Sequence, residues 1–319
     1  MKYLDYSVMR SVLNRFFGEE KTRQSRLVGP PRQFESDYFD IVRFFGGLGV
    51  DPSEVKIKRL ARPFEFKDEH IARFSEWAEE ELRRDGRLYR GSLATRVTEA
   101  DFGSAAPAIS IQPCDYGRQA GSCFALDLPH EEFDGGTLRQ YYLDTYTSRD
   151  IDDNPLAICL GVCGLLLTNE QDSPSVLLVR RAAHLASLED SIGPSAAGSI
   201  DWDEHSANLL EMIRSSLGDE IREELELHEN QYTLTPLAWA REVFRGERPQ
   251  VFCLIRVDMS GAELDSHMAG TIEASDEIAS YALAGLEDGL PPQTGSWGSL
   301  NPEARMNWLL LSEWLAEQH

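Results

Sequence analysis

Three glutamates in one short segment of the chain have a spacing that suits metal chemistry. Glu220, Glu223 and Glu224 stand at positions i, i+3 and i+4, so on an α-helix they share one face. Clustered carboxylates repel one another unless a positive group lies between them. Mg²⁺ is a hard cation that prefers oxygen ligands and bridges to substrate phosphates. The spacing therefore predicts a divalent-cation site, and an acidic face that is only solvated is the alternative.

The elements around these glutamates favour the metal site. A strand-like run over 175–179 is followed by Arg180 and Arg181, and then by a loop that ends at Gly198. After Gly198 the chain enters a long helical pattern, in which Gly218 is expected to mark a break. Its apolar stripe is expected to pack on a sheet with the glutamates beside it, and consists of Leu210, Ile213, Leu217, Ile221 and Leu225.

In this order of strand, loop, glycine and helix, the segment resembles the motif of the Nudix hydrolase family. That motif runs from a glycine to a glutamate, then to an arginine–glutamate pair, an aliphatic residue, two further glutamates, a glycine and a closing aliphatic residue. Gly198 is the expected opening glycine, and Glu211 lies at the family's distance before Asp219. The residues that fit their places in the motif are Glu220, Ile221, Glu223, Glu224 and Leu227.

The chain departs from the family's motif at three places. Gly198 lies 13 residues before Glu211, which implies an insertion of about seven residues. Asp219 replaces the arginine that braces the glutamates, and Glu226 replaces the glycine that lets the chain leave the helix in a left-handed conformation. Both changes add negative charge, which raises the carboxylate pKa values or weakens catalysis. The nearest candidates for the missing positive charge are Arg222 and Arg214.

The resemblance implies an activity. Nudix enzymes cut the pyrophosphate of a nucleoside diphosphate that is linked to another group. By resemblance, Glu220, Glu223 and Glu224 would hold Mg²⁺ or Mn²⁺ and form the catalytic site, and such ions orient the diphosphate and lower the pKa of a bound water. A carboxylate then takes the proton of that water. Glu224 is the first choice for this base, and the alternatives are Glu211, Glu242, Glu247 and Glu273.

Four residues are candidates for substrate binding. Arg180 and Arg181 end a strand just before the loop, so one is expected to contact phosphate and the other to pair with a carboxylate. A surface ion pair is the alternative for both. Gly198 opens the motif. Trp297 lies in a segment rich in Gly and Pro and is a candidate for stacking on a base, although such a residue more often packs a lid.

Three classes of function follow from these residues. The first is a metal-dependent pyrophosphohydrolase that acts on a small nucleotide of the ADP-ribose, NAD(H) or sugar-nucleotide type. The second is a Nudix-fold nucleotide-binding or regulatory protein with weak or no hydrolysis, which the departures at Asp219 and Glu226 favour. The third is an interaction protein whose acidic helix is a solvated face. Many Nudix relatives dimerise, so a homodimer is also an option.

The composition of the chain limits the kinds of molecule that it is expected to bind. The chain has 319 residues, of which 42% are hydrophobic, and that is enough for a substantial core. Its formal net charge of −23 argues against long nucleic acids and anionic membranes. The five cysteines are odd in number and have no CxxC spacing, which is typical of reduced buried thiols in the cytoplasm. The N-terminus lacks a long apolar segment, and no signal peptide is expected.

The sequence predicts an α/β fold with two domains. A polar segment that ends at Pro155 divides an N-terminal α+β domain of unknown role, residues 1–150, from a Nudix-like domain, residues 151–319. In the first domain we expect helices over 5–17, 36–45, 67–84 and 137–147, and a hairpin of strands over 108–116 and 122–128. In the second we expect a mixed β-sheet sandwiched between helices, with strands over 156–168, 176–181, 232–242 and 250–258 and later helices over 276–284 and 301–316.

Overall fold

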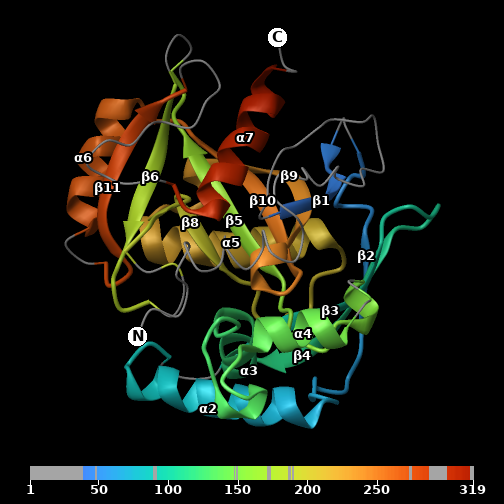
Figure 1. Ribbon diagram of the computed structural model, residues 1–319. Helices are drawn as coiled ribbons and strands as arrows, with labels where there is room; N and C mark the ends of the chain where they lie inside the picture. The colour runs from blue at the N-terminus through green and yellow to red at the C-terminus, as the bar shows by residue number, and fades with distance from the viewer. Residues whose placement is uncertain are drawn as a thin grey trace.

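The chain forms two β-sheets, with helices packed against both (Figure 1). A computed structural model describes residues 39–46, 49–88, 92–146, 148, 150–170, 174–185, 188, 190–272, 275–286 and 300–316. The larger sheet has eight strands and the smaller has three. The prediction of an α/β fold with a mixed sheet between helices is confirmed.

The larger sheet has the strand order β1-β9-β10-β5-β6-β11. Only β10 and β5 run parallel among the described strands of this sheet, and the other pairs are antiparallel. The short strands β7 (Ile192–Gly193) and β8 (Ala196–Ser199) pair with β6 and β5. The long strands are β1 (Phe39–Phe44), β5 (Gly161–Leu167), β6 (Ser175–Arg181), β9 (Tyr232–Glu242), β10 (Arg248–Val257) and β11 (Ile278–Gly285).

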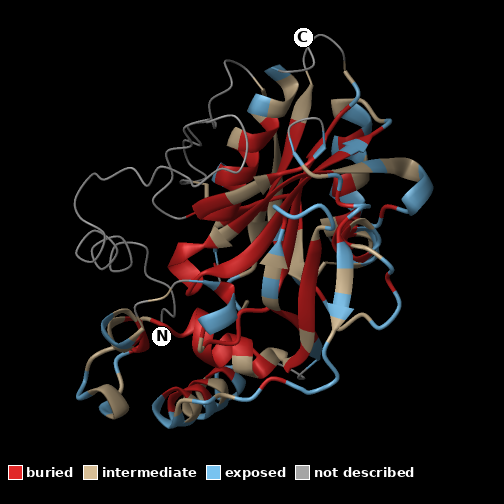
Figure 2. Cartoon of the chain, turned by 90° about the vertical axis from the view of Figure 1, so that its right-hand side faces the viewer, coloured by how far each residue is buried: buried red, intermediate tan, exposed pale blue. Residues whose placement is uncertain are grey.

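Helices cover both faces of this sheet. Neighbouring residues of a strand point to opposite faces, so a strand whose residues are all buried must be covered on both sides. Every residue of β5 is buried. Figure 2 shows that buried residues gather on the strands in the middle of the molecule. Leu166 packs in the core cluster that contains α5 (Leu209–Leu225) and α6 (Gly261–Thr271). Leu165 packs in the cluster that contains α7 (Pro302–Ala316). The sheet is therefore the middle layer of a sandwich, with α5 and α6 on one face and α7 on the other.

The helix α5 carries the glutamates and is continuous over its whole length. Asn208 begins it by accepting a hydrogen bond from the backbone N–H of Glu211 at 3.0 Å. The expected break at Gly218 is wrong, because Gly218 lies inside the helix, where a Cβ would lie 3.2 Å from the hydroxyl of Tyr232. The helix ends at Glu226, which has a φ of 52° in the left-handed region.

Apart from β1, the described chain before residue 150 forms the smaller sheet and the helices around it. Its strands lie in the order β2 (Lys56–Arg59), β4 (Ala108–Asp115) and β3 (Leu93–Asp101). Its helices are α2 (Glu69–Arg84), α3 (Tyr116–Gln119), a π-helical segment (Ala120–Phe124) and α4 (Leu138–Thr145). Short 3-10 turns lie at Glu131–Phe133, Ile151–Asp153, Glu229–Gln231 and Val243–Arg245.

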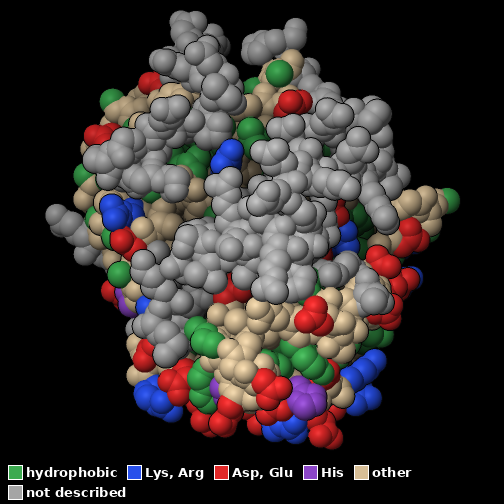
Figure 3. Space-filling view, in the orientation of Figure 1, with side chains coloured by type: hydrophobic (Ala, Val, Ile, Leu, Met, Phe, Trp, Pro, Cys, Tyr) green, Lys and Arg blue, Asp and Glu red, His purple; other side chains and the backbone are tan. Residues whose placement is uncertain are grey.

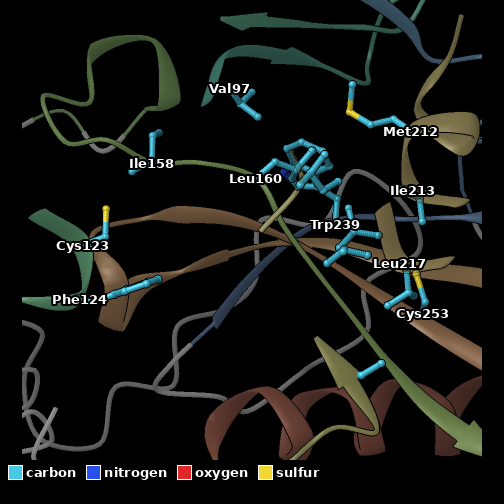
Figure 4. Close-up of a cluster of buried hydrophobic side chains, with 14 of the residues drawn as sticks. Val97, Cys123, Phe124, Ile158, Leu160, Met212, Ile213, Leu217, Trp239 and Cys253 are labelled. Atoms are coloured by element: carbon cyan, nitrogen blue, oxygen red, sulfur yellow. The ribbon is translucent and has the colours of Figure 1, made fainter. Parts of the chain in front are cut away.

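The parts of the chain before and after residue 150 pack together closely. Thr95 on β3 donates its backbone N–H to Ile200 at 2.8 Å and accepts the N–H of Leu160 at 2.7 Å. β1 precedes residue 150 but pairs with β9 in the larger sheet. Side chains from both parts also share one buried cluster, in which Val97 and Phe124 lie with Met212 and Trp239 (Figure 4). The two-domain division near residue 150 stays a prediction.

Several predicted elements match the structure and others do not. The helices predicted over 67–84, 137–147 and 301–316 are confirmed by α2, α4 and α7, and the four strands predicted after residue 155 by β5, β6, β9 and β10. The helix over 36–45 is wrong, because its C-terminal portion is β1, and the helix over 276–284 is wrong, because this segment is β11. Both form edge strands of the larger sheet, and edge pairing leaves little trace in local periodicity.

The hairpin predicted over 108–128 is wrong as well. β4 pairs with the earlier strand β3, and the residues after β4 continue into α3 and the π-helical segment. The helix predicted over 5–17 lies outside the described residues. All five cysteines are buried and free, as expected. Across the described residues, no helix is both long and apolar enough to cross a membrane.

Candidate active site

A cleft of about 700 Å³ is lined by residues of α5, β8, the beginning of α7 and the part of the chain before residue 150. Its volume is typical of small-ligand sites. Its acidic side chains are Asp201, Glu220, Asp276, Glu277 and Glu303, and its basic ones are Arg87, Arg181, His184, Arg245 and Arg248. Acidic and basic side chains are thus equal in number in the cleft, although the chain as a whole has a net charge of −23. Charges of both signs also mix on the exposed surface, as on α2 at the lower edge of Figure 3.

Glu220 lines this cleft and is held against the strand β8. Its carboxylate lies so close to Gly198 that a Cβ at position 198 would overlap Oε1. Burial, with the negative charges of Glu277, Glu223 and Asp201, raises the pKa of Glu220 to about 8. The opening glycine expected from the motif thus lies directly beside a motif glutamate, despite the insertion between them.

Glu224 lies one helical turn after Glu220 and is buried, with 6% of its surface exposed. Burial, followed by the negative charge of Glu220, raises its pKa well above the ordinary value, and the charge of Arg181 acts in the opposite direction. Glu220 is half-buried, so two neighbouring carboxylates with raised pKa values lie at least partly out of solvent. Such a combination is uncommon on purely structural surfaces and is found at functional sites.

Glu223, the third motif glutamate, points to solvent, with 70% of its side chain exposed. Arg222 lies 3.5 Å from Glu223 and 2.8 Å from Asp219. Its guanidinium therefore forms ion pairs at the surface. Across the described ranges, no group of three or more His, Cys, Asp and Glu side chains forms a metal site on its own.

Arg181 supplies the positive charge beside the buried carboxylates. It lines the cleft, and its charge lowers the pKa values of both Glu220 and Glu224. Its Nε is buried and has no hydrogen-bond partner. Arg180 lies outside the cleft lining and pairs with Asp190 at 2.8 Å. The two adjacent arginines thus occupy different environments, because successive residues of a strand point to opposite faces.

A buried ion network forms the other end of the cleft. Arg245 lies 2.6 Å from Glu303 and 3.3 Å from Glu242, and Arg248 lies 2.8 Å from Glu242. Arg248 also donates to Cys159 O at 3.0 Å and to Ser199 Oγ at 3.1 Å. The local sequence holds no signal for this network, because its members come together only through the pairing of β9 with β10 and the packing of α7.

The other carboxylates considered as bases have different positions. Glu242 is completely buried between the two arginines of this network. Glu247 is buried, with its Oε2 3.8 Å from Arg241 Nε. Glu211 caps the exposed first turn of α5, where it accepts the backbone N–H of Ala207 at 2.7 Å. Two predicted residues, Glu273 and Trp297, lie outside the described residues.

Comparison with known proteins gives matches to solved structures alone. No family model and no curated protein matches the chain. The NUDIX domain of NrtR from Shewanella oneidensis, solved with ADP ribose, is 17% identical over 55% of this chain and 97% of that one, with a TM-score of 0.33. The Ap4A hydrolase of C. elegans is 13% identical over 51% and 99%, with a TM-score of 0.32.

A third solved structure is the MutT NUDIX hydrolase from Burkholderia pseudomallei. It is 18% identical over 47% of this chain and 95% of its own, with a TM-score of 0.30. About half of the chain is thus similar to Nudix proteins of known structure.

Proposed function

We propose that the chain is a divalent-metal-dependent pyrophosphohydrolase of the Nudix type. Its substrate would be a nucleoside diphosphate linked to another group, of the ADP-ribose, NAD(H) or sugar-nucleotide type. One observation carries the proposal: two neighbouring carboxylates of α5, the half-buried Glu220 and the buried Glu224, have raised pKa values and feel the charge of Arg181. Glu220 and Arg181 line a cleft of about 700 Å³. Structural packing alone gives no reason to place one carboxylate in the interior and a second, half-buried one beside it, with the charge of Arg181 acting on both.

The donor atoms fit Mg²⁺ or Mn²⁺. Both ions accept carboxylate oxygens, and Mg²⁺ is commonly held by one or two carboxylates together with waters and substrate phosphates. Glu220 and Glu224 supply such a pair, and Glu223 would be a third ligand if it turned inward from its exposed position. A small number of protein ligands accords with the absence of a complete three-residue group among the described residues.

The residues of the cleft have distinct roles in this proposal. When bound, a divalent cation neutralises the diphosphate and lowers the pKa of a coordinated water. Glu220 and Glu224 would hold the cation, and Arg181 would orient a phosphate oxygen by charge and hydrogen bonding. Glu224 is the proposed base, because burial raises the pKa of a carboxylate toward the range in which it accepts a proton.

Phosphoanhydride hydrolysis by the purified chain tests this function. ADP-ribose, NADH, a sugar nucleotide and a dinucleoside polyphosphate are each assayed with Mg²⁺ and with Mn²⁺. We expect metal-dependent turnover that falls at least about 100-fold in Glu224→Gln and Glu220→Gln. Glu223→Gln reports whether the exposed glutamate takes part. Glu229→Gln, at an exposed position beyond α5, is the control. Turnover that is unaffected by Glu220→Gln and Glu224→Gln would place the chemistry elsewhere.

A nucleotide-binding or regulatory protein is the second candidate. The outward pair of Asp219 with Arg222 favours it, because the family's bracing arginine is absent from that position. It predicts nucleotide binding by calorimetry, with little turnover in either metal. The double variant Asp219→Arg, Glu226→Gly restores the family's two residues. Hydrolysis that appears only in this variant would identify the natural chain as a binding protein.

A further inference from the structure

One wall of the cleft is built by the part of the chain before residue 150. Tyr116 and Phe124 line it, at the two ends of the segment formed by α3 and the π-helical turns. Their rings meet edge to face, with centroids 6.2 Å apart. Phe124 also lies beneath the guanidinium of Arg245, 5.0 Å from its ring centroid. Isolated π-helical turns are frequent at functional sites, where they re-aim side chains.

Close packing fixes the segment that carries Tyr116. Asp115 caps α3 by accepting the backbone N–H of Gly117 at 2.7 Å. A Cβ on Gly117 would collide with the Glu79 carboxylate, and one on Gly121 with the backbone of Ser75, both on α2. The segment therefore rests directly on α2, and at Gly121, where the backbone of Ser75 lies against it, only glycine fits.

A hydrogen-bonded chain connects this segment to the motif strand. Gln119 is completely buried, and its Oε1 accepts the hydroxyl of Ser199 at 3.2 Å. Ser199 follows Gly198 on β8, and its Oγ also accepts from Arg248 at 3.1 Å. The segment that carries Tyr116 is thus linked to β8, where Gly198 lies against Glu220. Rigid elements with buried support of this kind are what a functional site requires.

The charges around Tyr116 favour an anion. Arg181, Arg245 and Arg248 all act on its hydroxyl, as does Glu277 with the opposite sign. Burial raises the pKa of Tyr116, so the hydroxyl stays protonated and is available as a donor. Arg181 has a buried Nε without a partner. Arginine and a phenolic hydroxyl together suit a phosphate oxygen, since both donate hydrogen bonds.

We propose that Tyr116 is a substrate-positioning residue, whose hydroxyl donates a hydrogen bond to a phosphate oxygen of the substrate beside Arg181. The inference rests on the proposed function in that the phosphate belongs to the nucleoside diphosphate. It goes beyond that function because two parts of the chain build the active site, which is composite in this sense. Glu220 and Glu224 come from α5, and Tyr116, which binds the diphosphate, comes from the part of the chain before residue 150.

Binding of inorganic pyrophosphate to the full chain tests this inference without any catalysis. Calorimetry is carried out in EDTA, so that no divalent cation contributes. We expect Tyr116→Phe to weaken binding about tenfold, because one hydrogen bond to a charged group is lost while the ring is kept. Arg181→Gln should weaken it more. The matched control is Tyr141→Phe, which removes a hydroxyl bonded to Asp68 on the same part of the chain, outside this cleft.

Failures of the two proposals are distinguishable. Weaker pyrophosphate binding by Tyr116→Phe, on a chain that hydrolyses nothing, supports the composite site and overturns the hydrolase. If a substrate is turned over, the variant should raise KM about tenfold and change kcat less. Turnover with unchanged KM and unchanged pyrophosphate affinity overturns the role of Tyr116 and leaves the hydrolase intact. A natural chain that fails to bind millimolar pyrophosphate also overturns it. A Tm of Tyr116→Phe equal to that of the natural chain shows that the variant is folded.

Discussion

Gly198 lies directly against the carboxylate of Glu220, where a Cβ would overlap Oε1. We expect Gly198→Ala to push this carboxylate out of its position. Because the flexible end of the Glu220 side chain can move away, the free energy of unfolding should change by less than about 1 kcal/mol. Turnover of any substrate should fall at least about tenfold, because small displacements of a site residue are costly in rate. The measurement is kcat/KM. Gly270→Ala on α6, where a Cβ has open space, is the control.

The raised pKa of Glu220 predicts how stability depends on pH without metal. Below about pH 4.5 the carboxyl is protonated in both states, and its burial carries no charge penalty. As the pH rises toward about 8, the unfolded chain releases this proton and the folded chain keeps it, so the folded state loses stability. Above about pH 8 the contribution of this group is constant.

Thermal melting across this pH range, in EDTA, measures the effect. We expect the Tm of the natural chain to fall with rising pH, and Glu220→Gln to remove part of that fall. Mg²⁺ should restore Tm most at high pH, since binding requires ionised carboxylates. A Tm profile that is the same in the natural chain, in Glu220→Gln and in Mg²⁺ contradicts the prediction. Glu80→Gln, at an exposed position on α2, is the control.

The adjacent residues Arg180 and Arg181 form a natural matched pair. Arg181→Gln removes the charge beside Glu220 and Glu224, so the pKa values of both carboxylates should rise further. NMR titration of the glutamate carboxyl carbons reports this shift directly. Arg180→Gln breaks only the exposed pair with Asp190 and should leave the titration unchanged. Equal effects of the two variants would refute the distinction between the two arginines.

The buried network at the other end of the cleft should be important for stability. Glu242→Gln removes the negative charge that both Arg245 and Arg248 contact. Each of these two buried guanidinium groups then has one charged partner fewer. We expect the free energy of unfolding to fall by about 3 kcal/mol, measured by urea denaturation. Glu65→Gln breaks an ion pair in which both side chains are largely exposed, so a change below about 1 kcal/mol is expected.

Glu226 ends α5 in the left-handed conformation at a φ of 52°, where the family's motif has glycine. A non-glycine residue costs about 1 kcal/mol in this conformation. Glu226→Gly should therefore raise the free energy of unfolding by about this amount. Glu223→Gly, three residues earlier and inside the helix, should lower it by about the same amount. If both variants lower the free energy of unfolding, this prediction is contradicted. The hydrogen bond of Glu226 with Thr271 Oγ1, at 3.4 Å, would then stabilise the fold by more than the left-handed backbone of Glu226 destabilises it.

Local patterns in the sequence determined the elements that carry the carboxylates. The apolar stripe predicted α5, because a helix that packs on a sheet repeats its buried side every 3.6 residues, and Ile213, Leu217, Ile221 and Leu225 are buried as expected. Leu210 is only partly buried, and Leu209 is buried in its place. The spacing of Glu220 and Glu224 predicted two carboxylates on one face of that helix. The strands predicted over 156–168 and 250–258 are the central strands β5 and β10, whose residues are almost all buried because both faces of the sheet are covered.

Only the tertiary structure decided which residues complete the cleft. Arg181 and Glu220 line the same cleft because β6 and α5 both pack against the strand β5, and Tyr116 reaches this cleft from a segment about 100 residues earlier. The buried network of Arg245, Arg248 and Glu303 arises from strand pairing and the position of α7. These contacts depend on long-range packing, and the hydrophobic periodicity of a segment carries information only about its own buried face.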